Sequence, residues 1–424
     1  MWTYIRGLLA SPPPPPPALQ AGAAFDKLFL SIVAILVVAV VFDRRRSTSA
    51  PPSPAQRTLQ RRYLTVWLCF KAADWMQGPY FHDLYSSKVI DGVSITDAAV
   101  ANLFLCGFVS AMLFGGIAGG LVDRHGRRRA CVAFALLQTL AALSTMAQSY
   151  PLLALGRVCG GFATSILMAA PEAWLCSEHN RQRLPASSLG ALFGAAYFAD
   201  ALVAIGAGQI ADAAAAAAGP AAPFLTSIAF LGAGAAAALA GWKENYGVSS
   251  SGGSGGGMME ALRILARDPA VRHLSLLQAL FEGAMYIFVL VWGGAMASAV
   301  QEARAGATPF GRIFSCFMAC CMLGGALFSF MGSLNVRPER YMQPVLVIAR
   351  QPPPPPPRKS HARFVPPIVA AHAFPAHCCN PICFPAHCCS PYVFPYTAHP
   401  ILPMERDVCV SLPLPHRILL LNCL

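Results

Sequence analysis

Two charged residues, Lys71 and Asp74, lie within an otherwise apolar stretch of the sequence. Side chains three residues apart share one face of an α-helix. A charged pair inside an apolar helix is costly and is seldom kept for stability alone. The spacing therefore predicts a functional pair, in which Asp74 holds the lysine in place or carries a proton.

Further ionisable and amide side chains occupy apolar stretches. Gln278 and Glu282 are four residues apart, so one helix face presents an amide beside a carboxylate. Arg157 lies near the start of its stretch, and Glu172 follows about four turns later, at the predicted cytoplasmic end. Asp200 stands in the middle of another stretch. The predicted substrate or coupling-ion residues are Lys71, Asp74, Arg157, Glu172, Gln278 and Glu282. Two alternatives stay open: internal ion pairs that only fix helix packing, and an Arg157 side chain that extends outward to the membrane interface.

The elements that carry these residues have the composition of membrane helices. Of the 424 residues, 56% are hydrophobic and 12% are charged, about half the charged fraction of a soluble domain. Mean hydropathy is +0.52. A spanning helix needs about 20 mostly apolar residues, and candidate spans occur at 25–42, 63–81, 98–121, 130–147, 152–175, 187–211, 221–241, 274–299 and 310–332. The fold class predicted is an all-α membrane protein.

The first candidate span, 25–42, follows the proline run Pro12–Pro17. It has the length of a signal peptide, but arginines at 44–46 stand where small cleavage-site residues would be expected. We therefore expect an extra leading helix or signal anchor.

Basic residues alternate between the predicted loops. Loops 43–62, 122–129, 176–186, 242–273 and 333–341 hold 18 Lys and Arg together, and the intervening segments hold 3. This bias predicts that the basic loops are cytoplasmic. It also explains the net charge of +12 without nucleic acid, because no basic stretch is interleaved with aromatics as a binding face would be.

A short motif lies in the loop between the third and fourth spans. Residues 119–129 read GGLVDRHGRRR, and they match the G-x-x-x-D-R-x-G-R-R pattern of the loop between helices 2 and 3 of major facilitators. Glycine permits the tight turn, and the aspartate is placed to bind arginine and a neighbouring helix terminus. A stray aspartate in a basic loop is the alternative, but it does not account for the order of the residues. The predicted gating motif comprises Gly119, Asp123, Arg124, Gly126, Arg127 and Arg128. Together they would form a charge latch that breaks and reforms as the halves rock.

Several phrases narrow the resemblance. Residues 71–75 (KAADW), 78–80 (GPY), 170–174 (APEAW), 241–246 (GWKENY) and 278–282 (QALFE) are similar to the molybdate-anion transporter branch of the major facilitators, over about 63–332. The resemblance implies molybdate uptake at the cell membrane, with molybdate or a related oxyanion and the lipid bilayer as partners. A tetrahedral oxyanion needs converging donors and cations, and Lys71, Arg157 and Gln278 are the available set. The fifth transporter helix lacks the glycine–proline pattern of antiporters, which favours a uniporter or symporter.

The expected organisation is that of a major facilitator with a departure at its end. Loop 242–273, with the flexible run Ser249–Gly257, separates six helices at 63–241 from a partial second half at 274–349. Region 1–62 contributes a proline-rich start, the extra helix and a basic loop. We therefore expect a major facilitator fold, apparently truncated in its second half.

Region 350–424 is rich in proline, cysteine and histidine. After six prolines at 352–357 it repeats with period ten over 364–403, and two of the units begin FPAHCC, at 374 and 384. Proline recurs too often for a spanning helix. We therefore expect a disordered tail or a translated tandem repeat that comes from a read-through intron, an alternative transcript or a wrong reading frame. Adjacent cysteines rarely chelate one ion together, and no metal or cofactor is predicted.

Three functional interpretations remain open at this point: an oxyanion transporter, a truncated membrane protein that does not transport, and a facilitator for another small solute. An enzyme is not predicted, because neither a nucleophile–base pair nor a phosphate-binding loop is evident in the sequence.

Overall fold

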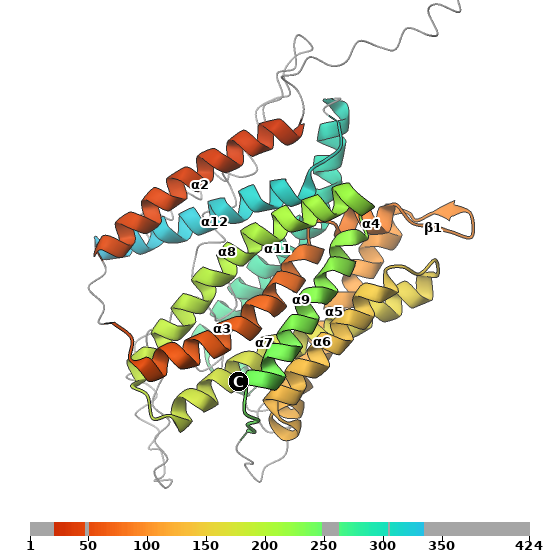
Figure 1. Cartoon of the computed structure of the whole chain (residues 1–424). Helices are drawn as coiled ribbons and strands as arrows, with labels where there is room; N and C mark the ends of the chain where they lie inside the picture. Colours follow the sequence, from red (N-terminus) through yellow and green to blue (C-terminus); the bar gives the residue numbers. More distant parts are fainter. Residues whose placement is uncertain (1–20, 47–50, 248–262, 304–305, 335–424) are drawn as a thin grey trace, which may run out of the picture.

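In the computed structural model, the described residues are 21–46, 51–247, 263–303 and 306–334. They form a bundle of long α-helices (Figure 1). The proline run, the run Ser249–Gly257, the residues from 335 to 349 and the repeat region 350–424 lie outside the described residues.

Long helices coincide with every predicted span, which confirms the polytopic pattern. They are α2 (Ala21–Arg46), α3 (Pro54–Gln77), α5 (Asp97–His125), α6 (Arg127–Ser144), α7 (Tyr150–Arg181), α8 (Ala186–Ala218), α9 (Ala222–Gly241), α11 (Pro269–Glu302) and α12 (Phe310–Ser333). Seven of the described helices are long and apolar enough to cross a membrane, and α3 and α6 fall outside that set. Both begin among arginines, and α3 also contains Lys71 and Asp74.

Helix α3 differs most from its predicted span, 63–81. It begins at Pro54, where the Ser53 side chain accepts a hydrogen bond from Gln56 N. It ends at Gln77, before Pro79, which has no N–H to donate. Phe81 belongs to a separate short helix, α4 (Phe81–Ser86). Hydropathy marks only the apolar part of a helix, so it misses the polar first turns of α3.

A small hairpin follows α4 and was not predicted. Strands β1 (Val89–Ile90) and β2 (Val93–Ser94) pair antiparallel, with Ile90 opposite Val93. Asp91 and Gly92 both have positive φ, at 52° and 79°. Such a pair favours a tight two-residue turn.

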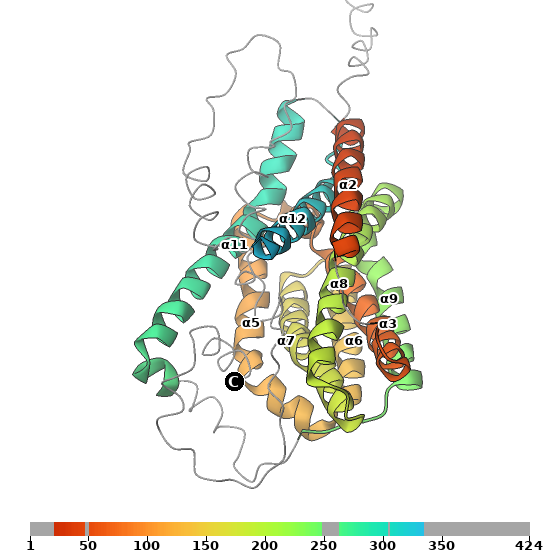
Figure 2. The ribbon, with the colours of Figure 1, turned by 90° about the vertical axis from the view of Figure 1, so that its left-hand side faces the viewer.

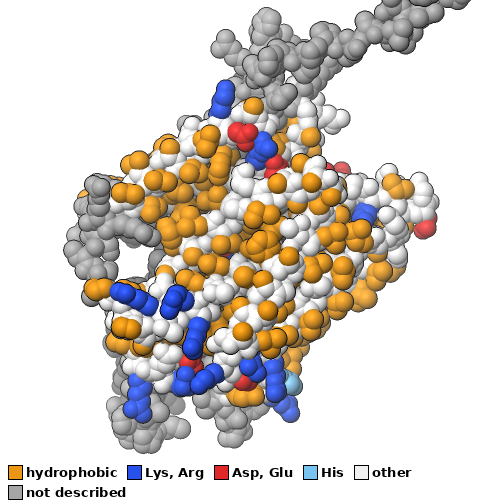
Figure 3. All heavy atoms as spheres, viewed as in Figure 1, with side chains coloured by type: hydrophobic (Ala, Val, Ile, Leu, Met, Phe, Trp, Pro, Cys, Tyr) orange, Lys and Arg blue, Asp and Glu red, His pale blue; other side chains and the backbone are white. Residues whose placement is uncertain are grey.

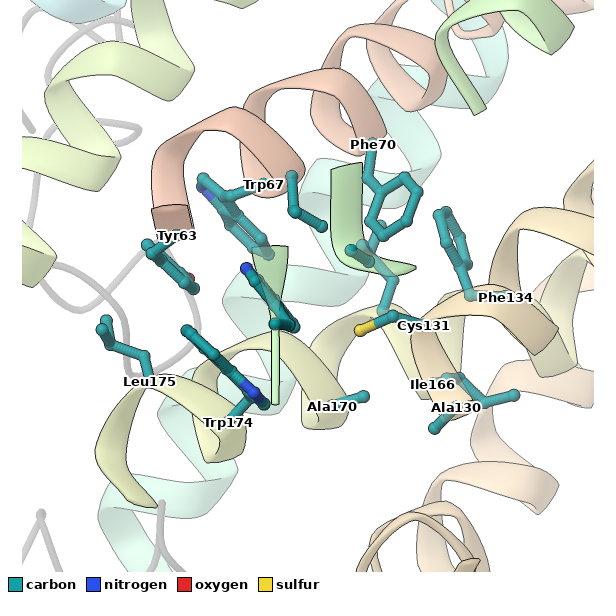
Figure 4. Close-up of a cluster of buried hydrophobic side chains, with 14 of the residues drawn as sticks. Tyr63, Trp67, Phe70, Ala130, Cys131, Phe134, Ile166, Ala170, Trp174 and Leu175 are labelled. Atoms are coloured by element: carbon teal, nitrogen blue, oxygen red, sulfur yellow. The ribbon is translucent and has the colours of Figure 1, made fainter. Parts of the chain in front are cut away.

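The largest core cluster joins α3, α6, α7, α8 and α9 (Figure 4). Trp174 of α7 stacks on Trp242, which follows α9, with ring centroids 3.9 Å apart. Tyr63 of α3 stacks on the other side of Trp242 at 6.3 Å. The three rings thus join α3 and α7 to the end of α9.

Helix α2 packs beside α12, and α12 packs on α8 (Figures 1 and 2). Leu36 of α2 is buried with Ile205 of α8 and Met318 of α12. Gly208 and Gly311 let α8 and α12 approach closely, because a Cβ on Gly208 would stand 2.6 Å from the Gly311 carbonyl oxygen.

Basic side chains gather at one end of the bundle, the lower end in Figure 3, where α3 begins and α5 and α9 end. Apolar side chains cover much of the face shown above them. Large apolar residues of α11, among them Leu276, Leu277 and Leu280, are exposed, as lipid contact requires.

Candidate functional site

Lys71 is the buried centre of a charged cluster inside the bundle. Its ammonium Nζ lies 3.6 Å from Asp74 Oδ2, one turn along α3, and 3.7 Å from Asp200 Oδ2 on α8. Only 6% of Lys71 is exposed. A buried ammonium is retained only where carboxylates or other acceptors compensate its lost hydration. Helices α3 and α8 therefore position these three groups together.

Two tryptophans complete the surroundings of Lys71. The ammonium lies 4.6 Å from the ring centroid of Trp75 and 5.6 Å from that of Trp67, within the range of cation–π attraction. Trp75 also donates from Nε1 to Asp200 Oδ1 at 2.8 Å. Each oxygen of Asp200 thus has its own partner.

Glu172 extends the cluster towards α7. Its carboxylate accepts a 3.0 Å hydrogen bond from the Tyr197 hydroxyl of α8 and lies within electrostatic range of Lys71. The prediction that Glu172 sits at the cytoplasmic end of its helix is wrong, because α7 continues to Arg181. The apolar pattern ends earlier than the helix, so Glu172 falls inside the bundle.

Helix α11 carries three polar side chains at successive turns, and one of them lies near this cluster. Gln278 Nε2 donates to Glu282 Oε1 at 2.6 Å, as their spacing predicts. One turn further, Tyr286 lies within electrostatic range of both Glu282 and Asp74. The phenol of Tyr286 in the second half therefore lies near Asp74 of the first half.

Arg157 lies in a different environment. Its guanidinium stands 4.9 Å from the ring centroid of Phe81, Nε donates to the Leu103 carbonyl at 3.4 Å, and it interacts with the phenol of Tyr85. It occupies space that a Cβ on Gly107 would need, with Nη2 2.6 Å from that position. Arg157 thus joins α7 to α4 and α5.

The structure therefore does not gather the predicted oxyanion set of Lys71, Arg157 and Gln278. In the described part of the chain, the contacts of Arg157 are with α4 and α5, and neither Lys71 nor Gln278 is among them. Hydropathy assigns each residue to a helix. It does not determine which neighbouring helix that residue faces.

Sequence reasoning also missed a polar chain beside the cluster. Gln77 Nε2 donates to Ser227 Oγ at 2.9 Å, and Gln138 Nε2 donates to Gln77 Oε1 at 3.1 Å. The chain links α3, α6 and α9 within the core. A glutamine inside each of two apolar spans was the available signal.

The loop motif folds into an ordered turn at the basic end. Arg127 donates from Nε and Nη2 to Asp123 Oδ1, at 2.9 and 2.7 Å, and from Nη1 to the Ala173 carbonyl at 3.1 Å. Gly126 has φ +100°, a conformation that side chains rarely adopt. Arg124 is exposed, and a Cβ on Gly119 would meet open space.

Residues 242–247 hold this turn in place, although sequence analysis assigned them to the linker. Glu244 accepts hydrogen bonds from the backbone N–H groups of Arg128, at 2.8 Å, and Arg129, at 3.2 Å, and so caps the start of α6. Gly247 N donates to the Asp123 carbonyl at 3.0 Å. In the described structure, these contacts of the motif are with α7 and with residues 242–247. That the motif breaks and reforms as the halves rock stays a prediction.

An ion-pair network instead crosses between the halves at the other end. Arg312 of α12 contacts Asp212 of α8 at 2.8 Å and Asp26 of α2 at 2.9 Å. The Tyr80 hydroxyl donates to Asp212 Oδ1 at 2.9 Å. These residues were not predicted, because their partners are far apart in sequence.

Comparison with known proteins places these features in a family. Residues 25–352 match a family described as sugar transporters with 12 transmembrane segments. The chain is 35% identical to the molybdate-anion transporter of Xenopus tropicalis over 305 residues, which is 71% of this chain and 64% of that protein. It is 31% identical to the molybdate-anion transporter of Takifugu rubripes, over 70% of this chain and 66% of that protein. The chain thus spans less than two thirds of the length of these relatives.

Solved structures agree on the architecture. The nucleoside transporter NupG matches with a TM-score of 0.56 at 10% identity, over 78% of this chain and 80% of that one. A D-xylose–proton symporter matches with a TM-score of 0.52 at 12% identity, over 77% of this chain and 80% of that one. Identities this low support the shared fold alone. The expected major facilitator fold is confirmed.

Proposed function

Because the chain belongs to this family of major facilitators with 12 transmembrane segments, we propose that it is a secondary transporter that carries molybdate or a related oxyanion across the cell membrane. The observation that carries the proposal is Lys71, a buried ammonium within the bundle, in a chain similar to proteins named for molybdate. The proposal is transport without chemical conversion of the solute.

Lys71 is the residue proposed to meet the anion, and Gln278 is the amide donor proposed to face it from the second half. Asp74, Glu172 and Glu282 are proposed to hold these donors or to carry a coupling ion. Tyr286 of α11, two turns after Gln278, lies within electrostatic range of Asp74, which supports a site that draws on both halves. We propose for Arg157 a packing role near α4 and α5, and for the loop motif a role in bracing the first half.

Uptake of molybdate by cells that lack their own transporter tests the proposal. Cells producing this chain should accumulate molybdenum from dilute molybdate, and Lys71→Ala should abolish most of that uptake. Loss of the buried ammonium of Lys71 removes the charge that attracts the anion. Lys27→Ala is a matched control, because Lys27 is exposed on α2.

A facilitator for a neutral solute is the second candidate, and the description of the matching family favours it. It predicts uptake of a sugar or nucleoside and no molybdate accumulation.

Molybdate uptake that Lys71→Ala leaves unchanged would remove this lysine from the proposed anion site.

A further inference from the structure

The charges around Lys71 determine how an anion can bind there. The inference drawn from them rests on the proposed function. Asp74 and Asp200 both lie within 3.7 Å of the ammonium. Glu172 acts on Lys71 at longer range. Each of these three charged neighbours of Lys71 is a carboxylate. One positive charge against two close negative charges leaves a net negative site.

Two neighbouring helices, α7 and α8, add negative charge to this balance. Helix α8 contributes Asp200 and α7 contributes Glu172, and the phenol of Tyr286 on α11 lies within electrostatic range of Asp74. Helix α9 has no ionisable side chain along its length. No second cation from these helices joins Lys71, and the guanidinium of Arg157 is engaged with α4 and α5.

A dianion placed against Lys71 would therefore meet more negative than positive charge. Lys71 and Asp200 are buried, so the repulsion there is only weakly screened. The ammonium must also leave a carboxylate before it can pair with the anion. Neutralising one carboxylate lowers the negative charge of the site and releases the ammonium at the same time.

We propose that the anion enters together with a proton, which binds to the carboxylate of Asp74 and frees Lys71 to pair with the anion. The proton comes from the aqueous side from which the anion enters, and both leave on the opposite side. The cycle is thus an anion–proton symport, in which one bound proton offsets part of the charge of the anion.

Asp74 suits this role better than Asp200. The side chain of Asp74 is 32% exposed, and its ion pair in the described structure is with Lys71. The side chain of Asp200 is 11% exposed, and its two oxygens are held by Trp75 and Lys71. A proton from water therefore reaches Asp74 more easily than Asp200. Protonation of Asp74 breaks one ion pair, the one with Lys71.

Calorimetric titration of the purified full chain in lipid nanodiscs with inorganic molybdate tests the proposal. Titrations at one pH in two buffers of different protonation enthalpy give the number of protons taken up, and we expect about one per molybdate. Because the bound state holds one more proton than the empty state, the apparent Kd should rise about tenfold per pH unit as the pH rises.

Asp74→Asn removes the group that takes up the proton. This variant should bind molybdate without proton uptake and with little dependence on pH. Asp200→Asn should still take up about one proton, because Asp74 remains. Asp97→Asn is a matched control outside the cluster, since the Asp97 side chain is 93% exposed, and it should behave as the wild type.

The outcomes separate the two proposals. Absence of molybdate binding by the wild-type chain at every pH contradicts the proposed function itself. Binding without proton uptake by the wild type overturns the symport and leaves the proposed function standing, even if Asp74→Asn does not fold. An unchanged proton count in a folded Asp74→Asn protein removes Asp74 from the role.

Discussion

Gly126 and Glu244 meet at the basic end of the first half, where the chain turns from α5 into α6. Gly126 adopts φ +100°, and a Cβ at this position would stand 2.6 Å from Cδ of Glu244. Gly119, in the same motif, lies in mid-helix with open space beside it. The backbone conformation therefore favours glycine at position 126, whereas the space beside Gly119 would admit a side chain.

Gly126→Ala should lower the free energy of unfolding by roughly 1–3 kcal/mol, because alanine must adopt a strained backbone conformation and displace the Glu244 carboxylate. Thermal unfolding of the purified chain in detergent measures the effect as a lower midpoint. Gly119→Ala is the control, and it should leave the midpoint unchanged or raise it, since alanine favours helix over glycine. Equal midpoints for the two variants would contradict this account.

Helices α2, α8 and α12 meet through one arginine. Arg312 bridges Asp26 of α2 and Asp212 of α8. The side chain of Asp212 is 11% exposed and that of Asp26 is 52% exposed, so the two ion pairs differ in their access to water. The extra leading helix is thus attached to both halves at this junction.

Arg312→Met should destabilise the chain by up to roughly 3–5 kcal/mol, because it leaves the buried Asp212 carboxylate without its cation. Asp26→Asn should cost less than about 1 kcal/mol, since exposed ion pairs contribute little. Thermal unfolding midpoints compare the variants, and adding Asp212→Asn to Arg312→Met should restore part of the loss. A larger effect for Asp26→Asn than for Arg312→Met would reverse this ranking.

The molecule as a whole has a basic end and an opposite end with few basic residues (Figure 3). The hairpin at Asp91 and Gly92 lies between α4 and α5, in a segment predicted to face away from the cytoplasm. The loop motif and the segment after α9 lie at the basic end, as the alternation of Lys and Arg predicts.

An epitope tag inserted after Gly92 should be accessible to antibody on intact cells that carry the protein at their surface. A tag inserted after Gly252, in the predicted cytoplasmic linker, should become accessible only after permeabilisation. Immunofluorescence with and without detergent measures both. Accessibility in the reverse order would overturn the predicted orientation.

The amino-acid sequence by itself determined the class of the molecule, its spans and its family. Hydropathy is a local property, and about 20 apolar residues must form a helix in lipid because their backbone groups have no other partner. The loop motif and the phrases around Lys71 and Glu172 are also contiguous, so the family resemblance could be recognised without coordinates.

Only the tertiary structure decided which side chains meet. It brought Asp200 to Lys71 and Tyr197 to Glu172, and it directed Arg157 towards α4 and α5. It also showed that residues 242–247 brace the loop motif and that Arg312 joins Asp212 across the halves. The physical reason is that such contacts depend on the rotation of each helix about its axis, which packing among all the helices sets and which the apolar pattern of one helix does not encode.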